Sequence, residues 1–102
     1  MAPRPLVLLV EDEPAQRAVL SYNLEAEGFE VQTADNGEDA LQLIAETPPD
    51  LILLDWMMPH VSGIEVCRRL KARPETRSIP LIMLSARAED VDQVRGLETG
   101  AD

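Results

Sequence analysis

The stretch that decides the fold runs from Asp50 to Asp55 and reads Asp-Leu-Ile-Leu-Leu-Asp. Its four central residues are apolar, which is typical of a strand buried on both faces of a parallel sheet. We expect this run to form the central strand and to stop at Asp55. In open sheets of this type, ligands bind outside the carboxyl ends of the strands, which is where Asp55 would lie.

Three further runs have the composition of strands. Leu6–Val10 is continuously apolar, contains β-branched residues and ends abruptly at an acidic pair. Residues 30–34 form a shorter candidate strand, and residues 81–84 read Leu-Ile-Met-Leu and stop at Ser85. Four strands are therefore expected, each ending at or near a polar residue.

A helix is expected over residues 15–27. Proline is tolerated in the first turn of a helix and acidic residues there complement the helix dipole, so Glu13-Pro14 fits a helix start. Gly28 is expected to end this helix as a C-terminal cap. The predicted apolar face consists of Ala15, Ala18, Val19, Tyr22 and Ala26.

Three more helices are expected between and after the strands. The second covers residues 37–46, because the Asn36 side chain can cap its first turn. The third covers residues 63–71, and the fourth covers residues 89–99. The predicted apolar faces are Ala40, Leu41, Ile44 and Ala45 in the second helix and Ile64, Cys67 and Leu70 in the third.

The order strand-helix, repeated four times, predicts an α/β fold with a doubly wound parallel sheet. The length of 102 residues suits one domain.

With 9 Lys and Arg against 19 Asp and Glu, the net charge is −10, which argues against direct binding of nucleic acid. Cys67 is the only cysteine, so no internal disulfide is possible and a reducing cytoplasm is expected. No apolar run approaches the length of a membrane span.

Polar residues that can carry chemistry follow the predicted strand ends. Glu11 and Asp12 follow the first strand, Asp55 the third and Ser85 the fourth. If the first and third strands are neighbours, the three carboxylates converge on one small pocket. Three like charges are unfavourable together, and a divalent ion would remove the conflict. Because all the ligands are oxygens, the pattern favours Mg²⁺ over zinc.

Asp55 is the candidate nucleophile, because a carboxylate can attack phosphorus and form an acyl phosphate. The Ser85 hydroxyl is a candidate donor to a phosphoryl oxygen. Each residue has a structural alternative: Glu11 or Asp12 alone is more often a helix cap, and Asp55 or Ser85 alone more often belongs to a turn. The predicted convergence of three acids favours the functional interpretation.

Five short motifs match one known family. They are the acidic pair in Val10-Glu11-Asp12-Glu13, the stretch from Asp50 to Pro59, Ser62-Gly63, Ser85-Ala86, and the stretch from Gly96 to Asp102. In these motifs the chain resembles response-regulator receiver domains, which have a flavodoxin-like fold. Residues 53–57 and 95–102 resemble the phosphate-regulon regulators of the winged-helix subfamily in particular.

The resemblance implies a role in two-component signalling. Asp55 would receive a phosphoryl group from a phosphohistidine on a sensor histidine kinase. Asp12 and Asp55 would ligate Mg²⁺ directly, with the backbone carbonyl of Met57 as a further ligand and Glu11 acting directly or through water. Ser85 would move toward the phosphate. The module would be a phosphorylated switch rather than a turnover enzyme, and its output would be transcription through a DNA-binding domain not included in this chain.

This chain departs from the family pattern at its C-terminal end. Family members continue for one more strand and helix, with a lysine at the end of that strand. Residues 1–102 are therefore expected to form a receiver domain that is incomplete at its C-terminus. Lys71, the only lysine, cannot replace the family's lysine, because it lies at the end of the third predicted helix. An exposed aliphatic face and an altered dimerisation surface would then favour self-association or swapping.

Two other classes of function remain open. Phosphatases that form an aspartyl-phosphate intermediate usually carry a second aspartate two residues after the nucleophile, where this chain has Met57. An interaction module that is never phosphorylated would keep only the fold. The acidic pair and Asp55 argue against that module, whereas the absent lysine argues for it.

Overall fold

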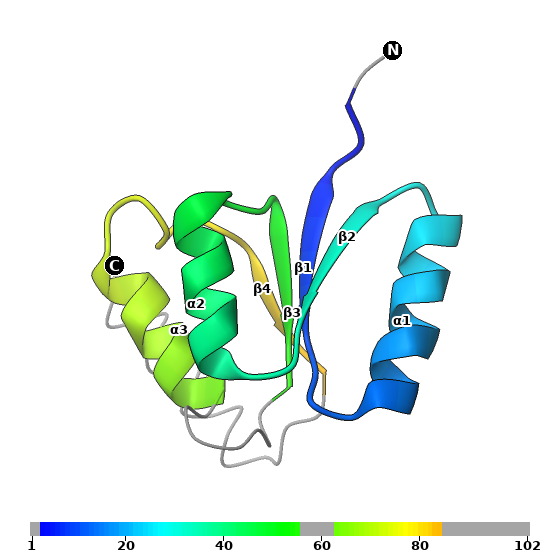
Figure 1. Cartoon of the computed structure of the whole chain (residues 1–102). Coiled ribbons are helices and arrows are strands. Elements are labelled where there is room, and N and C mark those ends of the chain that lie inside the picture. The colour runs from blue at the N-terminus through cyan, green and yellow to red at the C-terminus, as the bar shows by residue number, and fades with distance from the viewer. Residues whose placement is uncertain (1–2, 56–62, 85–102) are drawn as a thin grey trace.

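The computed structural model describes residues 3–55 and 63–84. Strands and helices alternate along these ranges (Figure 1). No helix within them has the length and apolar character needed to cross a membrane. The elements are β1 (Leu6–Val10), α1 (Pro14–Ala26), β2 (Glu30–Ala34), α2 (Gly37–Glu46), β3 (Leu51–Leu54), α3 (Gly63–Ala72) and β4 (Leu81–Met83).

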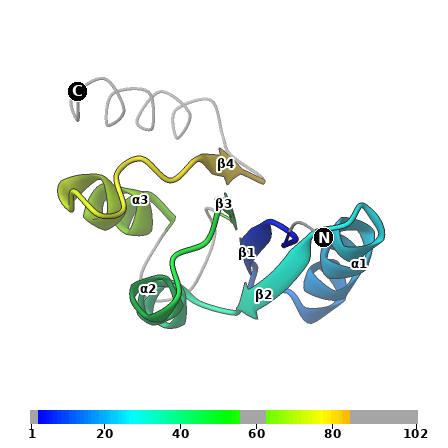
Figure 2. The same ribbon diagram turned by 90° about the horizontal axis from the view of Figure 1, so that it is seen from above.

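The four strands form one parallel sheet in the order β2-β1-β3-β4. β1 lies between β2 and β3, with Val10 opposite both Ala34 and Leu54. Helix α1 covers one face of the sheet, and α2 and α3 cover the other (Figure 2). The predicted α/β fold is confirmed, and so is the adjacency of the first and third strands on which the predicted site depends.

Successive side chains of a strand point to opposite faces, and here they build two apolar cores. The core beneath α1 contains Val7, Leu9 and Leu53. The core on the other face contains Leu8, Val10, Ala34, Ala40, Ile44, Ile52, Leu54, Val66 and Leu70. The apolar runs of β1 and β3 are thus continuous because helices cover both of their faces.

Most predicted boundaries agree with the structure to within one residue. β1, β2, α2 and β3 have the predicted bounds, and α1 begins and ends one residue earlier than predicted. Two predicted caps are confirmed: the Asn36 side chain accepts a hydrogen bond from the Asp39 amide at 2.8 Å, and Gly28 follows α1 with φ of 97°. The predicted helix over residues 89–99 lies outside the described residues.

The predicted packing face of α1 is wrong. Tyr22 is 75% exposed and Val19 is 59% exposed. The helix instead turns Leu20 and Leu24 toward the core beneath it. The two leucines remove more apolar area from water than alanines can, so they decide the rotation of the helix. A sequence pattern that counts alanine and leucine as equally apolar predicts the wrong face, because it ignores how much area each side chain can bury.

The predicted faces of α2 and α3 are correct in part. Ala45 is exposed, so it does not belong to the packing face, and Leu41 and Ile64 are only half-buried. Val66 is fully buried, although it was not predicted. The buried residues of the two helices are Gly37, Ala40, Ile44, Gly63, Val66, Cys67 and Leu70.

Candidate metal centre

Acidic residues follow the carboxyl ends of the two adjacent strands β1 and β3. The main-chain ladder continues past both strands, because the Glu11 amide donates to the Ala34 carbonyl at 3.0 Å and the Asp55 amide donates to the Val10 carbonyl at 3.0 Å. These bonds hold the backbones of Glu11 and Asp55 at the edge of the sheet. The local geometry therefore follows from the parallel pairing of the strands.

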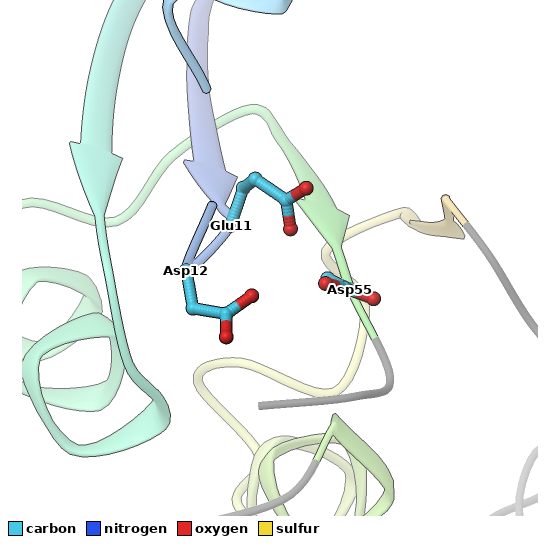
Figure 3. Close-up of side chains that lie close together, drawn as sticks. All are labelled: Glu11, Asp12 and Asp55. Carbon is cyan, nitrogen blue, oxygen red and sulfur yellow. The ribbon is translucent and has the colours of Figure 1, made fainter. Parts of the chain in front are cut away.

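The side chains of Glu11, Asp12 and Asp55 lie close together at this edge (Figure 3). One carboxylate oxygen from each residue lies within 4.8 Å of the corresponding oxygens of the other two. Glu11 is 3% exposed and Asp55 is 7% exposed, whereas Asp12 is open to solvent. The predicted convergence of the three carboxylates is confirmed.

The environment of Glu11 opposes its ionisation. Burial, followed by the hydrogen bond with Asp55 and the charges of Asp55 and Asp12, raises the pKa of the Glu11 carboxyl from 4.5 to about 7. Its Oε2 atom is buried and has no hydrogen-bond partner within the described ranges. A buried carboxylate oxygen of this kind is stabilised by a proton or by a cation.

The chemistry of the cluster fits a hard divalent cation. All the donors are carboxylate oxygens, which Mg²⁺ prefers, whereas protein zinc sites are rich in histidine and cysteine. A divalent charge would offset the repulsion within the cluster and satisfy the buried Glu11 Oε2. Exposed Asp12 leaves room for the waters that Mg²⁺ usually retains.

Arg17 is a contributor to the site that the sequence analysis missed. Its Nη1 atom donates a hydrogen bond to the Glu11 carbonyl at 2.9 Å. Since the Glu11 amide is bound to Ala34, both backbone polar groups of Glu11 are held. The only signal in the sequence is a basic residue six positions after Glu11, and many exposed helix residues show such spacing.

The substitution Arg17→Ala is expected to lower the free energy of unfolding by about 1–2 kcal/mol, because it removes a partly buried hydrogen bond from a charged donor. Urea denaturation without metal measures this loss. The matched control is Arg4→Ala, since Arg4 is exposed and donates no side-chain hydrogen bond within the described ranges. We expect the control to change stability by less than about 0.5 kcal/mol. Equal losses in both variants would show that the contact does not stabilise the turn.

Several predicted site residues lie outside the described residues. They include Met57, whose carbonyl is a predicted metal ligand, and Ser85, whose hydroxyl is a predicted phosphate donor. Their roles stay predictions. Gly63, from the Ser62-Gly63 motif, is the buried first residue of α3.

Comparison with known proteins agrees with this geometry. The family model described as "Response regulator receiver domain" matches residues 7–102. The phosphate regulon transcriptional regulatory protein PhoB of Rhizobium meliloti is 58% identical over 98 residues, which are 96% of this chain and 43% of that protein. PhoB of Escherichia coli is 49% identical over 96 residues, which are 94% of this chain and 42% of that protein. The chain thus spans about two fifths of the length of these relatives.

Solved structures give the same result. The N-terminal domain of a response regulator receiver protein from Methanoculleus marisnigri superposes with a TM-score of 0.83 at 38% identity, covering 91% of this chain and 78% of that one. The chemotaxis protein CheY4 of Vibrio cholerae superposes with a TM-score of 0.86 at 27% identity, covering 93% and 81%. A family match over almost the whole chain, the flavodoxin-like sheet order and the acidic cluster lead to one conclusion: the chain belongs to the response regulator receiver domain family.

Proposed function

We propose that this receiver domain accepts a phosphoryl group on Asp55 in a Mg²⁺-dependent reaction and thereby switches a downstream output. The observation that carries this proposal is the approach of the Glu11, Asp12 and Asp55 carboxylates to within 4.8 Å of one another. Such a cluster repels an anionic phosphoryl group unless a cation is present. When bound, Mg²⁺ would neutralise charge on the transferring phosphoryl oxygens.

Different residues would bind the metal, attack phosphorus and donate a hydrogen bond to the phosphoryl group. Asp12, Asp55 and Glu11 would hold the ion, together with the backbone carbonyl of Met57. A carboxylate oxygen of Asp55 would attack phosphorus, so that an acyl phosphate forms and the phosphorus-nitrogen bond of a phosphohistidine breaks. The imidazole leaves with the electron pair and takes up a proton. Ser85 would donate its hydroxyl proton to a phosphoryl oxygen once the phosphate is present.

Family membership supports the choice of partners. Receiver domains act in two-component systems, so we propose a sensor histidine kinase as the donor, in the cytoplasm. The relatives are named as transcriptional regulators of the phosphate regulon, so we propose transcription as the output. The net charge of −10 supports a receiver that does not itself contact DNA. We also propose self-association, because β4 is an edge strand of the sheet formed by the described residues and an edge strand can pair with another chain.

We propose a signalling switch rather than an enzyme. The acceptor is the domain's own Asp55, so each chain takes up one phosphoryl group, and only slow hydrolysis would return it to the starting state. A phosphatase would need an acid-base residue beside the nucleophile, and the sequence has Met57 at the position two residues on.

Acetyl phosphate with Mg²⁺, followed by intact mass spectrometry, tests the proposal. We expect the protein to gain the mass of one phosphoryl group, and we expect no gain when EDTA removes the metal. No gain with Mg²⁺, in a protein whose circular dichroism shows a folded α/β domain, would favour the alternative of an interaction module that is never phosphorylated. Rapid release of inorganic phosphate over many turnovers would favour a phosphatase.

A further inference from the structure

Basic residues are concentrated at the end of α3 in this acidic chain. Five of the nine lysines and arginines lie between positions 68 and 77. Residues 3–55 hold 12 acidic side chains and only two basic ones, whereas residues 63–84 hold two acidic and five basic ones. The five basic residues are Arg68, Arg69, Lys71, Arg73 and Arg77.

A hollow of about 380 Å³ lies beside this basic segment, between the C-terminal halves of α2 and α3. The two helices run next to each other on one face of the sheet (Figure 1). Ile44 and Leu70 are buried and form the floor, while Arg69 and Arg73 are exposed on the α3 side. We call this hollow the α2–α3 groove. Its complete lining is Leu41, Gln42, Ile44, Ala45, Pro48, Arg69, Leu70, Arg73, Glu75 and Thr76.

The α2–α3 groove is separate from the acidic cluster. α2 begins just after β2, at the carboxyl edge of the sheet where Glu11 and Asp55 lie, so its C-terminal half extends toward the opposite edge. None of the residues lining the groove belongs to the acidic cluster. A ligand in the groove would therefore not need the metal or the phosphoryl group.

Local structure accounts for only part of the basic segment. Arg68 and Arg69 pair with Glu65 at 3.2 and 3.1 Å, and Lys71 donates to the Arg77 carbonyl at 3.1 Å. Basic residues in the last turn also complement the helix dipole. Arg73 and Arg77, however, follow α3, are exposed and form no ion pair with any residue of the described ranges. Their charges are available to a partner.

We propose that the α2–α3 groove binds an acidic amphipathic helix of a partner protein. An apolar stripe on that helix would enter the hollow above Ile44 and Leu70, and its flanking carboxylates would face Arg69 and Arg73. This is recognition of a helix in a groove, in which apolar anchors recur at a spacing of three and four residues. Opposite charges at the rim fix the orientation of the partner and speed its association.

Charge selects this occupant over the alternatives. Electrostatic fields are screened over about 8 Å at physiological ionic strength, so a short acidic helix experiences mainly the rim of the groove. Arg69 and Arg73 outnumber Glu75 among the charged residues of that rim, so it carries a net positive charge. A nucleic acid or a second copy of this chain would extend beyond the rim. Its negative charge would then lie against the acidic remainder of the domain. A small inorganic anion would leave the apolar floor unused.

Two labelled helical peptides with the same leucine stripe test the proposal, one with glutamates and the other with lysines beside the stripe. Fluorescence anisotropy against the whole chain should show binding of the glutamate peptide, weakened by added salt, and at least tenfold weaker binding of the lysine peptide. In NMR spectra of isotope-labelled protein, the amide chemical shifts of residues in α2 and α3 should change when the glutamate peptide is added. Binding should be unaltered when EDTA is added.

Matched variants distinguish the groove from general charge. Arg69→Glu combined with Arg73→Glu should weaken binding of the glutamate peptide at least tenfold, whereas Arg4→Glu, at an exposed residue that does not line the groove, should change it less than twofold. Since Arg69 also pairs with Glu65, a second variant, Ala45→Trp, fills the groove without altering charge and should also weaken binding at least tenfold. Equal affinity for both peptides, shifts outside α2 and α3, or no binding up to about 1 mM peptide would overturn the proposal.

Discussion

Replacing Asp55 by asparagine is expected to abolish the gain of a phosphoryl group from acetyl phosphate. The amide oxygen is a far weaker nucleophile than a carboxylate oxygen and cannot form the acyl phosphate. The substitution also removes one of three charges that converge within 4.8 Å, so Mg²⁺ should bind more weakly. Intact mass spectrometry measures the first effect, and a Mg²⁺ titration followed by the fluorescence of Trp56, the only tryptophan, measures the second.

The control for this experiment is Asp35→Asn. Asp35 is an exposed aspartate after β2, at the same edge of the sheet but outside the acidic cluster. This variant should gain one phosphoryl group, as the wild type does. Asp55→Asn should be at least as stable as the wild type without metal, because it removes a buried charge from beside Glu11. Phosphorylation of a folded Asp55→Asn protein would mean that another acid is the acceptor.

The sheet and the acidic cluster could be predicted from the sequence because strong local signals specify them. β1 and β3 are unbroken apolar runs that end at acids, and a parallel sheet brings the carboxyl ends of its strands to one edge. Convergence of Glu11, Asp12 and Asp55 then required only that β1 and β3 be neighbours, which the strand order confirms.

Features that depend on tertiary packing could not be predicted in the same way. The rotation of α1 depends on which side chains bury most area against the sheet, and alanines obscured the stripe formed by Leu20 and Leu24. The contact between Arg17 and the Glu11 carbonyl depends on the path of the turn between β1 and α1. The α2–α3 groove depends on how two helices sit side by side, which no local pattern records.

Without metal, the domain is expected to lose stability as pH rises from about 5 to about 8, and Glu11→Gln is expected to remove that loss. The folded state raises the pKa of Glu11 from 4.5 to about 7, so between these values it binds a proton that the unfolded chain has released. The free energy of unfolding therefore falls with rising pH in this window. The shift corresponds to a loss of about 3 kcal/mol that is complete by about pH 8, one unit above the folded pKa.

Urea denaturation in EDTA across this pH range measures this loss of stability as the difference between the wild type and Glu11→Gln, which cancels the titration of groups outside the acidic cluster. Glu27→Gln, an exposed acid outside the cluster, is the matched control and should follow the wild type. Mg²⁺ should reverse the trend, because the proposed ion would bind the ionised Glu11 carboxylate and displace its proton, so the affinity for Mg²⁺ should rise as pH passes about 7. A wild type whose stability has the same pH dependence as Glu11→Gln, or Mg²⁺ binding that is independent of pH, would show that Glu11 does not hold this proton.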